Sequence, residues 1–126
     1  MPASRVWAGN IVSGLGVLFM LMDGAMHLMA PAPVVEAFHQ LGVPLSLAVP
    51  LGIIELLCVA VYVFPRTSVL GAVLLTGYLG GAVASHVRVG DPVFPVVFPV
   101  LIGVLFWGGL FLRDDRLRTL IVRKEK

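Results

Sequence analysis

Four long apolar stretches, with the cationic side chains gathered at one set of their ends, constrain this chain more than any other feature. The stretches cover residues 6–29, 45–64, 68–86 and 94–112, and each is close to the ~20 residues that a helix needs to cross a bilayer. Of the nine Lys and Arg residues, Arg88 alone lies in a loop at the opposite ends; the others are Arg5, Arg66, Arg113, Arg116, Arg118, Arg123, Lys124 and Lys126. Cytoplasmic loops carry such an excess of Lys and Arg. The pattern therefore predicts an all-α integral membrane protein with both termini cytoplasmic.

Short connections between the stretches predict an antiparallel four-helix bundle that forms one domain over residues 1–126. Residues 65–67 and 87–93 are too few to let neighbouring helices do anything but fold back on each other. The longer connection, residues 31–44, has the pattern of a short amphipathic helical turn. We expect it on the outer surface, as a simple connector or as a lid over the outer mouth of the bundle.

Composition limits the function classes open to the chain. Only 13% of the residues are charged, whereas soluble domains approach ~25%. The net charge of +2 does not indicate nucleic-acid binding, because the basic residues gather at a helix end where anionic lipid headgroups attract them. Cys58 is the only cysteine, so an internal disulfide and a CxxC relay are excluded. The predicted partner is the lipid bilayer.

Helical spacing of about 100° per residue divides the apolar stretches into faces. The protein-facing side of the first is predicted to be Asn10, Ser13, Gly16, Met20, Asp23, Gly24 and His27, and its lipid-facing side Leu15, Leu18, Phe19, Met22 and Met26. The corresponding inward face of the second is Ala48, Gly52, Glu55, Val59 and Tyr62. In the third stretch, Gly77 and Gly81 have the GxxxG spacing that permits close helix approach.

Ionisable side chains inside the apolar stretches mark the candidate site. A central Asp costs at least ~2.5–3.5 kcal/mol in a bilayer, so each such group needs a partner or a use. Asp23 and His27 are four residues apart on one helix face and can interact directly. Counting ~1.5 Å per residue from the outer boundary brings Asp23, His27, Glu55 and His86 into the outer half of the bundle, with Arg88 at its end.

Four interpretations of this cluster remain open. In the first, the carboxylates pair with His27, His86, Arg88 and the Tyr62 or Tyr78 hydroxyl only to fix helix register. In the second, the cluster lines a pocket for a small molecule such as a quinone, where carboxylate and imidazole exchange protons with a carbonyl or quinol oxygen. The others are a zinc or non-haem iron site, which no HxxxH or HExxH spacing supports, and a haem held by His27 and His86.

From the second interpretation follows an assignment of roles. Glu55, His27 and Asp23 are the predicted catalytic residues, which move protons, and His86, Arg88 and Tyr78 are the predicted ligand contacts. No residue is assigned to a metal. The residues leave the cofactor unknown, and a quinone is the candidate.

Several segments of the chain resemble the DoxX-like membrane proteins. They are LMDGAMHL (21–28), LGIIELL (51–57), FPRTSVLGAVLLTGYLGGAVASHVRVGD (64–91) and GVLFWGGLFLRDDRLR (103–118). The residues that recur in the family's pattern are Asp23, His27, Glu55, His86 and Arg88. The resemblance implies a four-helix protein of the bacterial inner membrane, linked through some relatives to sulfur oxidation with quinone reduction and to thiol or oxidative-stress complexes.

Two function hypotheses follow from the residues and the resemblance together. The leading one is a quinone-linked redox subunit that acts with partner proteins, because the chain has no redox group of its own. The alternative is a non-enzymatic membrane module that binds a small ligand or scaffolds a membrane complex, either alone or as a homo-oligomer.

Overall fold

The computed structural model describes residues 2–122, and over that range its regular structure is helical throughout. Its elements are α1 (Ala3–Met29), α2 (Ala32–Leu41), the 3-10 turn η1 (Leu45–Leu47), α3 (Ala48–Val63), the 3-10 turn η2 (Pro65–Thr67), α4 (Ser68–Arg88), α5 (Val93–Arg113) and α6 (Asp115–Ile121). The predicted all-α class is therefore confirmed for the described residues. Three members of the predicted cationic cluster, Arg123, Lys124 and Lys126, lie outside them.

Within residues 2–122, four helical segments are long and apolar enough to cross a membrane. They are Ala3–Met29, Leu45–Val63, Pro65–Arg88 and Val93–Arg113. Large apolar side chains cover their outer faces, and Leu18, Leu57 and Val104 each expose 60% or more of their surface. Soluble monomers rarely expose apolar patches of this extent. These faces suit contact with the acyl chains of a bilayer.

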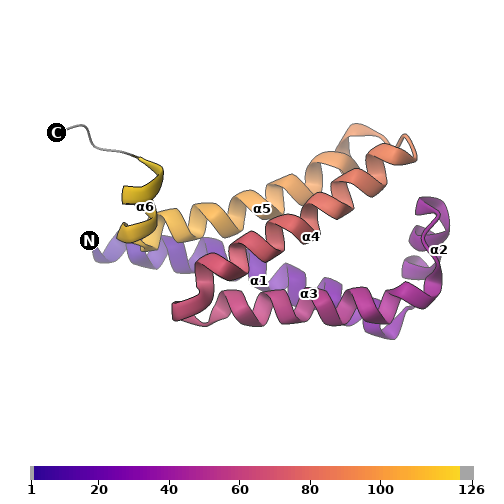
Figure 1. The fold of residues 1–126 in the computed structure, drawn as a ribbon, viewed down its shortest axis with the longest axis horizontal. Coiled ribbons are helices and arrows are strands. Elements are labelled where there is room, and N and C mark those ends of the chain that lie inside the picture. Colours follow the sequence, from indigo (N-terminus) through magenta and orange to yellow (C-terminus); the bar gives the residue numbers. More distant parts are fainter. Residues whose placement is uncertain (1, 123–126) are drawn as a thin grey trace.

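The four long helices pack as a ring. Helix α1 lies against α3 and α5, and α4 lies against the same two helices (Figure 1). The centre is filled by side chains that are at most 1% exposed, namely Met20, Val59, Tyr62, Ala72, Leu75, Phe106 and Leu110. Because lipid is as apolar as these side chains, tight packing and buried hydrogen bonds hold the helices together.

Pro65 and two hydroxyl side chains form the turn between α3 and α4. Proline has no N–H to continue the α3 ladder, and α3 ends at Val63 just before it. The Thr67 hydroxyl donates to the Val61 carbonyl at 2.7 Å, and the Ser68 hydroxyl donates to the Tyr62 carbonyl at 2.7 Å. Carbonyls that the end of a helix leaves unpaired are thereby satisfied, which lets the chain turn within η2.

The predicted faces of the first two long helices are largely confirmed. Ser13, Gly16, Met20 and Gly24 are buried on α1, and the inward face of α3 is buried at all of its predicted positions. Asn10 is an error of the prediction, because it is exposed although its neighbour Gly9 is buried. Phe19 and Met26, predicted to face lipid, are half-buried; Phe19 packs edge-on against Phe98 of α5, with ring centroids 5.1 Å apart.

Close helix approach occurs at glycines other than the predicted pair. A Cβ atom added to Gly77 or Gly81 would meet nothing within 4 Å, so the GxxxG prediction is wrong for packing within the described chain. A Cβ on Gly109 would collide with Ser13 of α1, and a Cβ on Gly71 would collide with the Tyr62 backbone. Gly109 and Gly71 therefore mark tight contacts between α1 and α5 and between α3 and α4.

The two ends of the bundle carry different elements. Figure 1 shows α2 and the α4–α5 connection at one end, and the beginning of α1 with η2 and α6 at the other. Helix α6 begins at an N-cap, where the Asp114 carboxylate accepts hydrogen bonds from the backbone N–H groups of Arg116 and Leu117. Asp23 and His27 lie in the last turns of α1, and Glu55 lies in the first half of α3, so all three are toward the α2 end.

Candidate functional site

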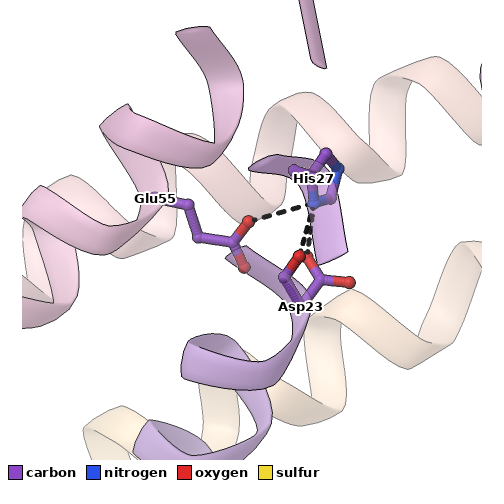
Figure 2. Close-up of side chains that lie close together, drawn as sticks. All are labelled: Asp23, His27 and Glu55. Carbon is purple, nitrogen blue, oxygen red and sulfur yellow. Dashed lines mark hydrogen bonds and ion pairs between the residues drawn. The ribbon is translucent and has the colours of Figure 1, made fainter. Parts of the chain in front are cut away.

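Asp23, His27 and Glu55 meet where α1 crosses α3. His27 Nδ1 donates to the backbone carbonyl of Asp23 at 2.7 Å, and it lies 3.4 Å from the Asp23 carboxylate and 3.6 Å from Glu55 Oε2. Figure 2 shows both carboxylates turned toward the same imidazole nitrogen. The structure thus brings the three predicted catalytic residues together; we call them the carboxylate–histidine cluster.

Two glycines explain why the helices come so close at this point. A Cβ atom on Gly52 would lie 2.9 Å from His27 Cβ and 3.0 Å from the Gly24 carbonyl, and a Cβ on Gly24 would lie 2.7 Å from the Leu56 side chain. Small residues at a helix interface let the backbones approach closely, and glycine is the smallest. The glycine pair therefore sets the distance between His27 and Glu55.

Glu55 is the most enclosed member of the cluster. Its side chain is 0% exposed, and its Oε2 accepts a hydrogen bond of 2.9 Å from the Tyr78 hydroxyl of α4. Its other oxygen, Oε1, has no hydrogen-bond partner among the residues described. A buried carboxylate is costly unless its oxygens are satisfied, so the unpaired Oε1 needs a physical explanation.

His86 and Arg88 do not pair with Glu55, in contrast to the interpretation that listed them among the partners of the carboxylates. His86 Nδ1 pairs with the Asp91 carboxylate at 2.5 Å, and Arg88 donates to the Leu41 carbonyl at 2.5 Å. The α4–α5 turn, which contains Gly90 at φ 73°, carries Asp91 back toward the end of α4. Asp91, five residues further along the chain, therefore takes the place of Glu55 as the partner of His86.

A cavity of about 730 Å³ lies between the helices at the α2 end. Of the predicted site residues, Asp23, His27, Tyr78 and His86 line it, whereas Glu55 and Arg88 are not among its lining residues. Apolar side chains make up most of the remaining wall, including Phe19, Met20, Phe38, Leu79, Phe94, Phe98 and Ile102. The cavity is thus a largely apolar space with a few polar groups on opposite walls.

Helix α2 covers part of this cavity. Phe38 is its buried residue, and the Phe38 ring packs edge-on against the His27 imidazole with centroids 5.5 Å apart. Val34 and Leu41 also line the cavity. The hydrogen bond from Arg88 to the Leu41 carbonyl ties the end of α2 to α4. The amphipathic segment predicted between Pro31 and Pro44 is therefore a helix with its apolar side on the cavity.

A second buried polar group lies nearer the other end of the bundle and was not predicted. The Tyr62 hydroxyl donates to the Phe106 carbonyl at 2.8 Å and lies 2.9 Å from the Ser13 hydroxyl, which accepts from Arg113 Nε at 3.3 Å. Tyr62 was predicted as an alternative partner of the carboxylates, and this is wrong. Ser13 and Tyr62 were both predicted to face inward, which was the only signal that they meet.

The carboxylate–histidine cluster also has the make-up of a metal site. Asp23, His27 and Glu55 each offer a ligand atom, and these atoms all lie within 4.8 Å of one another. The imidazole and the carboxylates can alternatively hold and pass protons to a molecule in the cavity. The second ring nitrogen of His27 points away from Glu55 (Figure 2), so a single imidazole can meet the carboxylates on one side and another group on the other.

Comparison with known proteins supports the resemblance seen in the sequence. A family model described as the DoxX-like family matches residues 11–109, which include every predicted site residue. No curated protein and no solved structure matches the chain. The match spans all four long apolar helices, so the chain is a multi-pass membrane protein.

Proposed function

The chain belongs to the DoxX-like family, and from this membership and the cavity we propose that it binds a small, largely apolar molecule of the quinone class within the membrane. In this proposal the chain forms a single-domain, antiparallel four-helix bundle in the bacterial inner membrane, with both termini cytoplasmic. Its cavity then opens in the outer half of the bilayer.

The cavity is the observation that carries this proposal. Small-molecule pockets are typically ~300–1,000 Å³, mainly apolar, with a few polar groups that fix orientation. The cavity of about 730 Å³ has that composition, with His27 and Asp23 on α1 and His86 and Tyr78 on α4. A quinone ring with polar oxygens at opposite edges matches polar groups on opposite walls.

The histidines can exchange protons with such a ligand. In both His27 and His86, Nδ1 is engaged by an oxygen of the protein, which leaves Nε2 for the ligand. An imidazole nitrogen donates when protonated and accepts when it is not. Reduction of a quinone takes two electrons and two protons; the histidines supply protons, and a partner redox protein supplies the electrons, because the chain has no redox group of its own.

A stability measurement tests the proposal. A short-chain quinone at ~100 times its dissociation constant should raise the free energy of unfolding by ~2.7 kcal/mol, measured on the detergent-solubilised protein. His27→Ala should remove most of this gain. His39→Ala is the matched control, because His39 is exposed on α2 and does not line the cavity.

The opposite result would favour the alternative class of function. If the quinone stabilises wild type and His27→Ala equally, or if it stabilises neither protein, the cavity is not a quinone site. The remaining proposal is then a non-enzymatic module that scaffolds a membrane complex or a homo-oligomer.

A further inference from the structure

We propose that the carboxylate–histidine cluster binds one divalent transition-metal ion, of the zinc, iron or manganese class, at the junction of α1 and α3. Asp23, His27 and Glu55 are the ligands. This inference does not depend on quinone binding, because the three residues form the site without any ligand in the cavity.

The distances fit a metal centre. Zinc bonds to imidazole nitrogen and carboxylate oxygen are ~2.0–2.2 Å long, which at tetrahedral angles places neighbouring ligand atoms ~3.3–3.6 Å apart. His27 Nδ1 lies 3.4 Å from Asp23 Oδ2 and 3.6 Å from Glu55 Oε2. The third separation, between the two carboxylates, is within 4.8 Å. Small side-chain rotations would close it.

The charge of the cluster also calls for a cation. Glu55 is fully buried and Asp23 is half-buried, and among residues 2–122 their ion-pair partner is His27 alone. Buried charges are retained in proteins when they are paired or coordinate metals. A divalent ion balances the two carboxylates and leaves the imidazole neutral.

The unsatisfied oxygen of Glu55 points to the same conclusion. Glu55 is 0% exposed, and Oε1 has no partner within the described chain although its carboxylate faces Asp23 and His27 (Figure 2). Oε2, the oxygen nearer His27, already accepts from Tyr78, so a metal ion held by this carboxylate would supply the partner that Oε1 lacks. Tyr78, which donates to Oε2, then acts as the outer partner that orients a ligating carboxylate.

Coordination requires one change at His27. Nδ1 now donates to the Asp23 carbonyl; on metal binding Nδ1 presents its lone pair and the ring proton resides on Nε2. Asp23 and His27 also line the cavity. Three protein ligands with one side open to a cavity are the arrangement of zinc sites that keep a position for water or substrate.

Direct titration with zinc tests the site. The full chain, freed of any polyhistidine tag and stripped with chelator in detergent, should bind about one Zn²⁺ per chain by calorimetry, without added quinone. Loss of an outer partner weakens metal sites ~10–100-fold, so loss of a ligand in Glu55→Gln or Asp23→Asn should raise the dissociation constant at least ~100-fold. Both changes are nearly isosteric, so both variants should fold. A helical circular dichroism spectrum identifies the folded variants.

Asp91→Asn is the matched control. It alters the other histidine–carboxylate pair, His86 with Asp91, and should leave zinc affinity unchanged. Absence of saturable zinc binding in wild type would overturn the proposal and leave protons as the charge-balancing species. Equal affinity in wild type, Glu55→Gln and Asp23→Asn would overturn the assigned ligands. Should Glu55→Gln not fold, Asp23→Asn decides, since the Asp23 side chain is 37% exposed.

Discussion

Glu55 links three helices through one carboxylate. It is carried by α3, receives a hydrogen bond from Tyr78 of α4 and faces His27 of α1. Glu55 is buried next to the point where Gly24 and Gly52 bring α1 and α3 together. A carboxylate at such a crossing affects both packing and chemistry, and substitutions can separate the two.

Glu55→Gln and Glu55→Leu should differ in stability but not in their effect on function. Gln retains an oxygen that accepts from Tyr78, so Glu55→Gln should fold normally while losing proton transfer and metal binding. Leu leaves the Tyr78 hydroxyl without its partner. Hydrogen bonds between membrane helices contribute ~0.6 kcal/mol on average and up to ~1.7 kcal/mol, which is the expected coupling between Glu55→Leu and Tyr78→Phe in a double-mutant cycle.

The cycle is measured by reversible unfolding of the four proteins in mixed micelles. If the effects of Glu55→Leu and Tyr78→Phe on the free energy of unfolding simply add, the Tyr78 hydrogen bond contributes nothing to stability. Tyr62→Phe serves as a control, because the Tyr62 hydroxyl bonds to Ser13 and Phe106 rather than to Glu55.

Much of this residue-scale detail follows from spacing, and the exceptions have clear causes. Asp23 and His27 share a helix face by their separation of four, and Glu55 faces inward by the periodicity of its helix. The pairing of His86 with Asp91 and of Arg88 with the Leu41 carbonyl was not predicted. Both depend on the conformation of connections, and helical periodicity carries no information about these.

At the scale of the helices, the small residues determine which pairs come closest. Glycine spacing in α4 suggested Gly77 and Gly81, but their positions face open space. The contacts at Gly71 and Gly109 were not distinguished beforehand, because several glycines in each helix satisfy a similar spacing. Which of them faces a neighbour depends on the rotation of the helix, and that is set by the packing of all four.

Two adjacent glycines in α5 test whether the glycines that face a neighbouring helix determine the close contacts. Gly109→Ala should destabilise the protein by at least ~1 kcal/mol, because overpacking costs ~1–3 kcal/mol and the new methyl group would meet Ser13 of α1. Gly108→Ala should be neutral or slightly stabilising, since a Cβ there meets nothing within 4 Å and Ala favours helix over Gly by ~0.5–1 kcal/mol.

Thermal unfolding in detergent compares the two variants directly. Gly71→Ala and Gly77→Ala in α4 provide a second pair with the same expectation, because only Gly71 lies against Tyr62. Equal melting temperatures within both pairs would mean that the helices can separate slightly at no cost, contrary to the packing described.

At the scale of the whole molecule, fold class was the most predictable feature. Apolar length alone identifies four helices able to span a bilayer, and the structure contains them. The cavity was not predictable in size, because it depends on how α2 lies over the bundle and on side chains from several helices. The orientation in the membrane follows from charge, and it is a separate prediction.

Arg and Lys placement predicts that the end of the bundle with η2 and α6 faces the cytoplasm. Figure 1 places the beginning of α1, η2 and α6 at the same end, and Arg5, Arg66, Arg113, Arg116 and Arg118 belong to these segments or adjoin them. Each Lys or Arg near an anionic cytoplasmic leaflet contributes ~1 kcal/mol of attraction. Arg88, at the α2 end, is engaged by the Leu41 carbonyl.

Reporter fusions in the bacterial membrane test this orientation. Fusions after Lys126 and within residues 65–67 should give cytoplasmic signals, and fusions within residues 31–44 should give signals from the opposite side. Replacing Arg66 and Arg113 by Gln while adding two Lys residues to the 31–44 segment should shift a fraction of the molecules to the inverted topology, because the charge bias sets orientation. A C-terminal fusion of the unaltered chain that reports from outside the cytoplasm would contradict the assignment. The α2 end and its cavity would then face the cytoplasm, and a quinone would have to exchange its protons with that compartment.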